Sequence, residues 1–477
     1  MMTPEFSPDF VRVAGSYRDP EGFVFYQDNR VFRALTKDGL ASYHDFRQSP
    51  LCEWLEEEKW VTRTWETDDA ASVGAIAAKY PEITGIIEQS RIPFISYPYE
   101  WSFDMLKDAA LHTLDLLLCS GKYEFILKDA TAYNIQFLGC RPIFIDILSI
   151  AKYVPGTPWA GYTQFCQQFL FPLALTAHRS VHFQHFLRSY LEGIPLHVMK
   201  PLLGGSGWRK AGMFKHVILQ SFFQSGFQAD NPALKSNFQS LKFSLDHVNA
   251  LVCAMKKIVT QLHQGSSQRH WVGYSDNRSY TALEVEAKRR FVEKHLENVR
   301  PNSVWDLGCN TGEFSLIARK YTPLVVAADA DPESVNHLYR YCRQNGISEI
   351  LPMVLDVTNP SPGLGWNNLA RQGFLDRGKP TMVLMLALLH HLCVTHNVPF
   401  EYIFNLLLIV EAEYVIVEFV PKSDPMVKKL LTNREDVYPW YNLLVFETEA
   451  FKHFSLVDRH ELPTGKRVLY CLQRHGH

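Results

Sequence analysis

One stretch decides the fold of the second half of the chain: Val304-Trp305-Asp306-Leu307-Gly308-Cys309-Asn310-Thr311-Gly312-Glu313-Phe314-Ser315. An apolar strand reaches Asp306, a loop containing two glycines and an asparagine follows, and a helix begins at Glu313. Glycine permits positive φ angles and a close approach of the backbone to a ligand. The first turn of the helix has N–H groups without partners inside the helix. The stretch therefore predicts a ligand-binding turn between a strand and a helix.

Strands and helices alternate on both sides of this turn, which favours a parallel sheet covered on both faces. We expect strands at Ser303–Leu307, Leu324–Ala328, Ile350–Leu355, Thr381–Leu386 and Tyr414–Phe419, and helices from Glu313, over Pro332–Asn345 and around Tyr402–Val410. Two later strands, Phe454–Val457 and Val468–Leu472, have no long helix between them. They predict an antiparallel hairpin that closes the sheet. The fold class is α/β, with a Rossmann-like sheet of seven strands in this half.

The acidic residues separate this turn from a dinucleotide-binding turn. The loop reads D-x-G-x-N-x-G and not G-x-G-x-x-G. Asp306 stands just before the glycines, where a carboxylate can orient an ammonium group. Asp329 ends the next strand, and a carboxylate there can accept two hydrogen bonds from the hydroxyls of a ribose. These features favour S-adenosylmethionine over a nicotinamide dinucleotide.

From Ser303 onward the chain resembles the class I S-adenosylmethionine-dependent methyltransferase family. The resemblance implies S-adenosyl-L-methionine as the cofactor and places the following residues around it: Asp306, Gly308, Asn310 and Gly312 at the methionyl part, Asp329 at the ribose, Asp356 and Val357 at the adenine, and Leu386 along the cofactor. The segment Asn359–Trp366 resembles a subgroup related to nodulation-type methyltransferases. Two alternatives stay open: a degenerate turn without a ligand, and a nicotinamide or nucleotide site.

Candidate residues for the methyl acceptor follow the fourth and fifth strands. His391, with His390 second, is a candidate base that removes a proton from a hydroxyl acceptor. Either histidine could instead form a hydrogen bond inside the core. Glu418 ends the fifth strand and either contacts the acceptor or caps a loop. Trp271, Tyr274 and Tyr280 either cover the cofactor or simply pack together.

The first half of the chain contains a D-x-x-x-x-N pattern at Asp129 and Asn134, and a second acid, Asp146, follows a short hairpin. The order resembles the catalytic loop of protein-kinase-like and aminoglycoside-phosphotransferase-like folds. Leu127 replaces the usual histidine, no glycine-rich phosphate loop is evident, and Arg33 is the nearest substitute for the strand lysine. We interpret the region as a degenerate, non-catalytic kinase-like domain. Turn residues of an unrelated helical domain, and active phosphoryl transfer, remain alternatives.

Other elements of this half are expected as follows: a hairpin of Phe23–Tyr26 and Val31–Leu35, a helix at Phe103–Ser120, strands at Phe125–Leu127, Ile135–Phe137 and Ile143–Ile145, a loop at Leu203–Trp208 within a helical stretch, and a helix at Leu251–His263. A polar stretch from Gln264 to His270 precedes a charged helix at about Ala282–Glu297. The predicted division is an α+β domain at 1–264, a linker and lid segment at 265–281, and a methyltransferase domain at 282–477.

Composition limits the class of protein. The chain has 477 residues, a formal net charge of −2 and 47% hydrophobic residues, so neither nucleic acid nor a membrane surface is favoured as a partner. The nine cysteines form no C-x-x-C pair, which predicts free thiols and a cytoplasmic protein. No metal site is expected. The chain has no Asn/Asp-Pro-Pro-Tyr/Phe motif after the fourth strand, and this absence disfavours methylation of an amine on a nucleobase.

Three functions follow from these patterns. The first is methyl transfer to a hydroxyl or similar group of a small or biosynthetic molecule. The second is a regulatory or scaffold protein that binds S-adenosylmethionine. The third is a bifunctional kinase-like methyltransferase. The sequence leaves the acceptor and the oligomeric state open.

Overall fold

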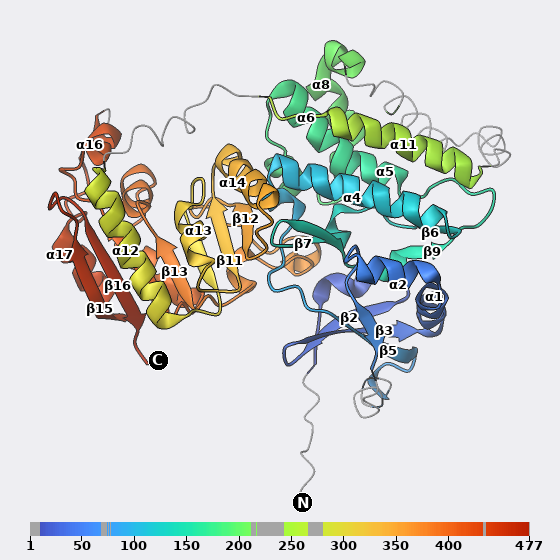
Figure 1. Cartoon of the computed structure of the whole chain (residues 1–477), viewed down its shortest axis with the longest axis horizontal. Coiled ribbons are helices and arrows are strands. Elements are labelled where there is room, and N and C mark those ends of the chain that lie inside the picture. The colour runs from blue at the N-terminus through green and yellow to red at the C-terminus, as the bar shows by residue number, and fades with distance from the viewer. Residues whose placement is uncertain are drawn as a thin grey trace, which may run out of the picture.

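The structure is a computed structural model that describes residues 10–67, 74, 76, 78–210, 216, 243–265, 280–432 and 436–476, without the side chains of 205–210. We refer to the described residues up to 265 as the N-terminal part and to those from 280 as the C-terminal part. Figure 1 shows the two parts side by side. Of the predicted lid residues, Trp271 and Tyr274 lie outside the described residues, whereas Tyr280 lies within them.

A seven-stranded sheet forms the centre of the C-terminal part. In spatial order its strands are β12 (Ile350–Val354), β11 (Val325–Asp329), β10 (Val304–Leu307), β13 (Met382–Met385), β14 (Tyr414–Phe419), β16 (Val468–Arg474) and β15 (Phe454–Glu461). The first five strands are parallel, and β16 pairs antiparallel with both β14 and β15. The strand order reverses direction beside β10, which is where open α/β sheets leave a crevice for ligands.

Six helices are described between and beside these strands: α12 (Ala282–Val299), α13 (Glu313–Ala318), α14 (Pro332–Gln344), α15 (Phe400–Ile409), α16 (Pro425–Leu431) and α17 (Leu443–Phe451). Helix α12 crosses the sheet in Figure 1. It begins with a capping box, in which the Thr281 side chain accepts from the Glu284 amide and the Glu284 carboxylate accepts from the Thr281 amide. This cap fixes the start of the helix close to Tyr280.

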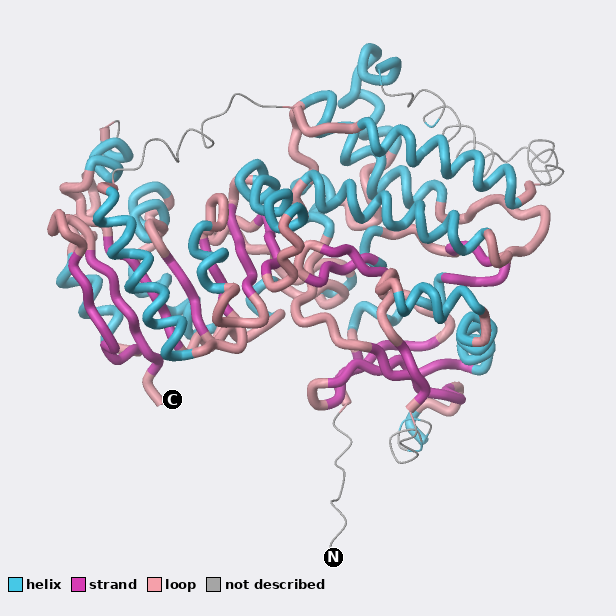
Figure 2. Tube along the Cα trace, viewed as in Figure 1, coloured by secondary structure: helices cyan, strands magenta, loops and turns pink. Residues whose placement is uncertain are grey.

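The N-terminal part combines an antiparallel sheet with a group of helices. In spatial order the sheet has β1 (Val11–Arg12), β2 (Gly22–Gln27), β3 (Arg30–Thr36), β5 (Ile83–Gln89) and β4 (Thr64–Glu66). Its described helices are α1 (Lys37–Arg47), α2 (Pro50–Glu57), α4 (Phe103–Gly121), α5 (Tyr162–Phe165), α6 (Phe171–Arg179), α7 (Gln184–Ser189), α8 (Leu196–Lys210) and α11 (Leu245–Gln261). Figure 2 shows this sheet below α4, α6 and α11.

Two short antiparallel pairs lie between the sheet and these helices: β6 (Phe125–Leu127) with β9 (Ile150–Lys152), and β7 (Ile135–Leu138) with β8 (Arg141–Phe144). Two expectations for this part differ in extent from the structure. The interruption predicted at Leu203–Trp208 is confirmed at Gly204, where φ is 62° and the backbone leaves the helical conformation, but the rest of that stretch is helical and belongs to α8. The strand expected at Ile143–Ile145 begins earlier, at Arg141, and ends at Phe144.

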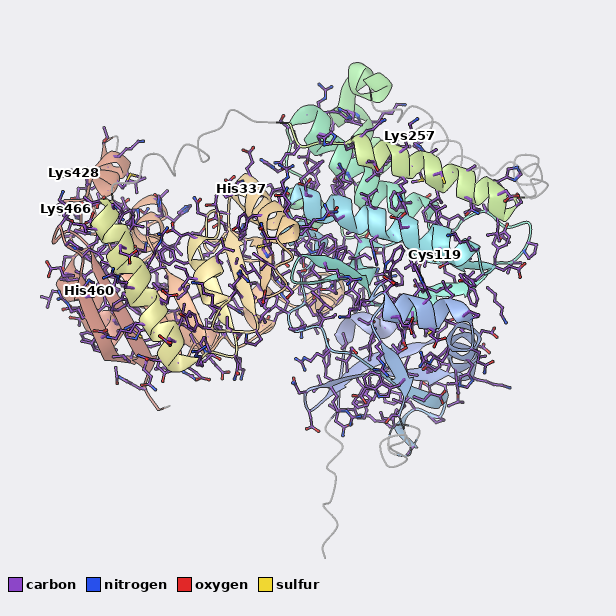
Figure 3. All side chains as sticks on the ribbon, viewed as in Figure 1. Cys119, Lys257, His337, Lys428, His460 and Lys466 are labelled. Atoms are coloured by element: carbon purple, nitrogen blue, oxygen red, sulfur yellow. The ribbon has the colours of Figure 1, made fainter. Side chains whose placement is uncertain are left out.

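The N-terminal and C-terminal parts share one buried core. The Tyr339 hydroxyl on α14 donates to the Asp108 carboxylate on α4 at 2.7 Å, and Phe94 packs against Trp305 of β10 with ring centroids 5.8 Å apart. Arg377 forms a fully buried ion pair with Glu100. In Figure 3, side chains fill the contact region between β7 and α14, the helix that also carries His337. One continuous hydrophobic cluster includes residues of both parts.

The described residues lack two features. None of their helices has the length and apolar character needed to cross a membrane. The same residues contain no group of three or more histidine, cysteine, aspartate or glutamate side chains placed to hold a metal ion.

Candidate functional site

Three alternate residues of the loop after β10 adopt left-handed backbone conformations. The φ angles are 78° at Gly308, 50° at Asn310 and 86° at Gly312. Left-handed geometry is accessible to glycine and, among other residues, most readily to asparagine. A Cβ atom at Gly312 would also collide with Leu338 of α14. The D-x-G-x-N-x-G pattern therefore supplies the residue types that this turn requires.

Asp306 and Asp329 hold this loop from two neighbouring strands. The Asp306 carboxylate is buried and accepts from the Ser315 hydroxyl at 2.6 Å. Burial raises the pKa of Asp306 to about 6. The Asp329 carboxylate accepts from the amides of Asn310 and Asp331 at 2.8 and 2.9 Å, and burial raises its pKa as well. The two acids thus lie at adjacent strand ends and keep oxygen atoms near the loop.

A pocket of about 520 Å³ opens at these strand ends. This volume lies within the range of small-molecule sites. Its lining includes all the predicted cofactor residues except Gly312: Asp306, Gly308, Asn310, Asp329, Asp356, Val357 and Leu386. Gly312 shapes the turn without lining the pocket. The structure therefore brings together residues from the ends of β10, β11, β12 and β13.

The chain turns sharply after β13. Ala387 has φ 52°, a strained value for a residue with a Cβ atom. With this bend, Leu386 and Leu388 both line the pocket. Strained backbone is often found at functional sites, where the surrounding structure maintains it.

The structure separates the two candidate histidines. His391 is half-buried and lines the pocket, as does His396. Burial, together with the nearby His396, lowers the pKa of His391. His390 is 2% exposed, does not line the pocket, and has an Nδ1 atom without a hydrogen-bond partner among the described residues. Of the two, His391 is therefore the one placed to meet a ligand.

Glu418 was predicted either to contact the acceptor or to cap a loop, and the structure places it behind the pocket. It is fully buried, does not line the pocket, and forms ion pairs with Lys288 at 2.7 Å and Arg467 at 3.4 Å. Its carboxylate also accepts from the Tyr280 hydroxyl at 2.7 Å. Against the effect of burial, these two cations hold the pKa of Glu418 below its usual value. Glu418 acts on the pocket through Lys288 and Tyr280, which both line it.

Sequence reasoning missed Lys288 and Phe314 as pocket residues. Lys288 lies one turn after Glu284 on the buried face of α12. Lys288 shares this buried face with Phe291 and His295, which follow it at helical spacing. A lysine among apolar positions is a signal in the sequence, because lysine is rarely buried without a partner. That partner, Glu418, is 130 residues away, so local pattern could not identify it.

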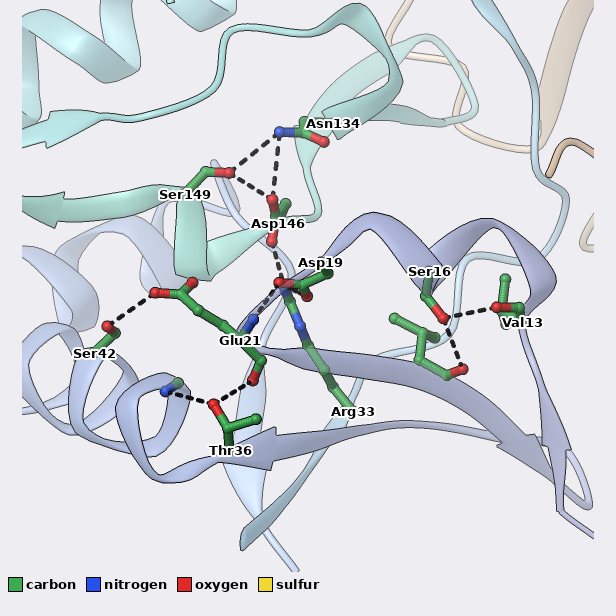
Figure 4. Close-up of polar contacts among 12 residues, drawn as sticks. Val13, Ser16, Asp19, Glu21, Arg33, Thr36, Ser42, Asn134, Asp146 and Ser149 are labelled. Atoms are coloured by element: carbon green, nitrogen blue, oxygen red, sulfur yellow. Dashed lines mark hydrogen bonds and ion pairs between the residues drawn. The ribbon is translucent and has the colours of Figure 1, made fainter. Parts of the chain in front are cut away.

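The N-terminal part brings two of its three candidate residues together. The Asn134 amide donates to the Asp146 carboxylate at 3.4 Å, and Arg33 of β3 pairs with both Asp146 and Asp19 (Figure 4). Against the effect of burial, the charge of Arg33 holds the pKa of Asp146 below its usual value. Asp129 is exposed and accepts from the Gln164 side chain at 3.2 Å.

Comparisons with known proteins gave one extended match. The nodulation protein NoeA of Rhizobium meliloti (strain 1021) is 35% identical over 468 residues, which cover 97% of this chain and 96% of that protein. No family model matches the chain.

Three solved structures are similar to part of the chain. The N-methyltransferase NodS from Bradyrhizobium japonicum WM9 in complex with S-adenosyl-L-homocysteine is 9% identical, with a TM-score of 0.31, covering 43% of this chain and 100% of that chain. Magnesium protoporphyrin IX methyltransferase from Synechocystis PCC 6803 with bound SAM is 16% identical, with a TM-score of 0.29 and coverage of 44% and 86%. The bifunctional kinase-methyltransferase WbdD is 20% identical, with a TM-score of 0.30 and coverage of 44% and 43%.

Proposed function

The chain belongs to the family of the nodulation protein NoeA, and within that family we propose that its C-terminal part is an S-adenosylmethionine-dependent methyltransferase. The main support is the convergence of Asp306, Asp329 and Asp356 at the ends of three adjacent parallel strands, around one pocket. Asp306 offers a carboxylate for the ammonium of the methionyl group. Asp329 can accept hydrogen bonds from ribose hydroxyls in addition to its two backbone amides, because an ionised carboxylate has about four acceptor sites.

The acceptor of this reaction is proposed to be a hydroxyl or similar group of a small or biosynthetic molecule. His391 supports it, because a neutral imidazole at the pocket wall can take the proton of a hydroxyl as the methyl group is transferred. Its lowered pKa keeps the ring neutral at pH 7. The transfer otherwise depends on alignment of the acceptor with the methyl group, which the walls of the pocket provide.

Titration calorimetry of the full chain with S-adenosylhomocysteine tests the cofactor site through its pH dependence. The pKa of Asp306 is about 6 in the ligand-free protein, and the ammonium of the ligand prefers the ionised carboxylate. Affinity should therefore rise by about tenfold in all between pH 5 and pH 7, and then level off. The Asp306→Asn variant, which keeps the shape but has no titrating group there, should bind weakly with little change over this range. A wild-type protein that does not bind S-adenosylhomocysteine would refute the proposal.

A second candidate function is nucleotide binding in the N-terminal part, which would make the chain a bifunctional kinase-like methyltransferase. It is favoured by the arrangement of Arg33, Asn134 and Asp146 (Figure 4). In kinases a basic residue of the third strand contacts the phosphates, while an asparagine and an aspartate hold magnesium. The oxygens of Asn134 and Asp146 suit magnesium, which commonly takes few protein ligands and completes its shell with phosphate and water.

This candidate predicts magnesium-dependent binding of ATP by the full chain, measured by calorimetry with and without magnesium chloride. Asp146→Ala should abolish the binding, because it removes the carboxylate assigned to magnesium. Asp129→Ala is the matched comparison: in the described structure its carboxylate accepts from Gln164 and forms no hydrogen bond with Arg33, Asn134 or Asp146, so this change should leave ATP affinity nearly unchanged. The absence of any ATP binding by the wild type would remove the candidate and leave a scaffolding role for this part.

A further inference from the structure

The pocket has an uneven distribution of charge. Five acidic residues line it: Asp306, Glu313, Asp329, Asp331 and Asp356. Among the described residues, Lys288 is the only lysine or arginine in the lining. The methionyl end of the proposed cofactor carries an ammonium and a carboxylate, so a carboxylate entering this pocket meets one fixed cation.

We propose that Lys288 binds the carboxylate of the methionyl group, so that Asp306 and Lys288 together recognise the amino-acid end of the cofactor. This inference rests on the proposed function and adds a specificity-determining residue to it. The ligand class is an adenosyl thioether or sulfonium that retains its α-carboxylate.

The ammonium group of Lys288 has one donor to spare. It donates to the Glu418 carboxylate at 2.7 Å and to the Tyr280 hydroxyl at 3.2 Å. An ammonium group has three N–H donors, so a third remains for a ligand after these two bonds within the described structure. The pocket lining includes Lys288, and this third donor is the means by which it can contact a bound carboxylate.

Aromatic rings restrict the position of Lys288. Its Nζ atom lies 4.9 Å from the ring centroid of Tyr280 and 4.9 Å from that of Phe314, on the first turn of α13. Both rings also line the pocket. Contacts of this kind attract a cation to the ring face. The Lys288 side chain, which extends from α12, is buried along its length. Its ammonium group is therefore held in place before a ligand arrives, and little side-chain entropy is lost on binding.

Glu418 supplies the counter-charge for a lysine that is almost completely shielded from water. Lys288 is 5% exposed, and buried charges are normally paired with an opposite charge. The fully buried Glu418 balances this charge, while Arg467 takes a second share of Glu418 and pairs with Asp424 at 2.8 Å. Burial raises the pKa of Asp306, and the charge of Lys288 opposes this rise. The two side chains therefore lie close enough to interact at the same end of the pocket.

The position of this pair determines which ligands should bind. S-adenosylmethionine has both the ammonium and the carboxylate, whereas its decarboxylated form keeps the sulfonium and the ammonium but lacks the carboxylate. The two ligands share every contact except the one assigned to Lys288. The decarboxylated form also carries one more net positive charge, which the five acidic residues of the pocket attract, so the contact is measured by the change in preference between the wild type and Lys288→Met.

The test is calorimetry of the full-length wild type, Lys288→Met and Lys288→Arg with both ligands. We expect the wild type to bind S-adenosylmethionine about tenfold more tightly than the decarboxylated form, the size of one charge-assisted hydrogen bond. Lys288→Met should reduce that preference to within about twofold, while Lys288→Arg should retain most of it. Lys294→Met is the control, because Lys294 lies on the same helix but pairs with Asp458 and does not line the pocket.

Any result other than these overturns the inference. A wild type that shows no preference for the carboxylated ligand overturns it, even if none of the variants folds. A Lys288→Met protein that keeps the preference, or that loses both ligands equally, assigns Lys288 a structural role only. A wild type that binds neither ligand refutes the methyltransferase proposal itself, and so separates that failure from a wrong assignment of Lys288.

Discussion

Replacing Arg377 with methionine is expected to lower the free energy of unfolding by about 3–5 kcal/mol. Arg377 and Glu100 are both buried, with side chains 1% and 0% exposed, and they join the C-terminal part to the N-terminal part. Methionine fills much of the space but leaves the Glu100 carboxylate buried without its cation. Urea denaturation of the full chain, followed by circular dichroism, measures the loss.

Lys379→Met is the matched control for this prediction. Lys379 lies two residues further along the same segment, but its ion pair with Glu411 is exposed to solvent, with the lysine side chain 69% exposed. Exposed pairs contribute about 0–1 kcal/mol, so this variant should unfold nearly as the wild type does. The double variant Arg377→Met with Glu100→Gln should regain part of the loss, because it removes the unpaired charge. Equal stability of Arg377→Met and Lys379→Met would contradict the importance of the buried pair.

The variant His391→Ala is expected to reduce kcat by about 10²–10⁴-fold with the acceptor that a substrate screen identifies. The affinity for S-adenosylhomocysteine should stay within about twofold, since the loss concerns proton removal and not cofactor binding. Stopped assays of methyl transfer, together with calorimetry, measure the two quantities separately. In the wild type, kcat should rise with pH as His391 loses its proton and then level off, with a midpoint below the usual pKa of histidine, because burial lowers the pKa of His391.

The neighbouring histidines provide the comparison for His391. His396→Ala changes a second histidine of the same pocket without removing the proposed base, and its effect on kcat should be much smaller. Full activity of His391→Ala would return His391 to a packing role. Loss of cofactor affinity in the same variant would mean that the ring supports the cofactor and not the acceptor.

The cofactor side of the pocket could be predicted because its information is local. The residue types of the turn from Asp306 to Gly312 are those that left-handed backbone requires, and Asp329 follows at the end of the next strand. Carboxyl ends of parallel strands meet at one edge of a sheet, so Asp356 and Leu386 had to lie nearby. The predicted hairpin after the last helix also forms, with β15 and β16 antiparallel.

The charged groups that complete the pocket could not be predicted in this way. The strand ending at Glu418 could be located, but its pairing with Lys288 joins residues 130 positions apart. Arg377 and Glu100 are 277 positions apart, and neither has a local pattern that names the other. In the N-terminal part, α1 and β5 each contain a glycine, Gly39 and Gly85, that weakens the periodic signal. Gly204 similarly suggested a longer loop than the short break that α8 has at this residue.

The ring of Trp305 lies at the boundary between the two parts and contacts both of them. Trp305 immediately precedes Asp306 on β10, and it packs against Phe94 of the N-terminal part and Phe374 of the C-terminal part. The strand that presents Asp306 to the pocket is thus supported partly by a residue more than two hundred positions earlier in the chain. A fragment beginning at Tyr280 would expose this ring and Tyr339 to water. We therefore expect the two parts to unfold in one cooperative transition, and a ligand that occupies the pocket to stabilise the N-terminal helices as well.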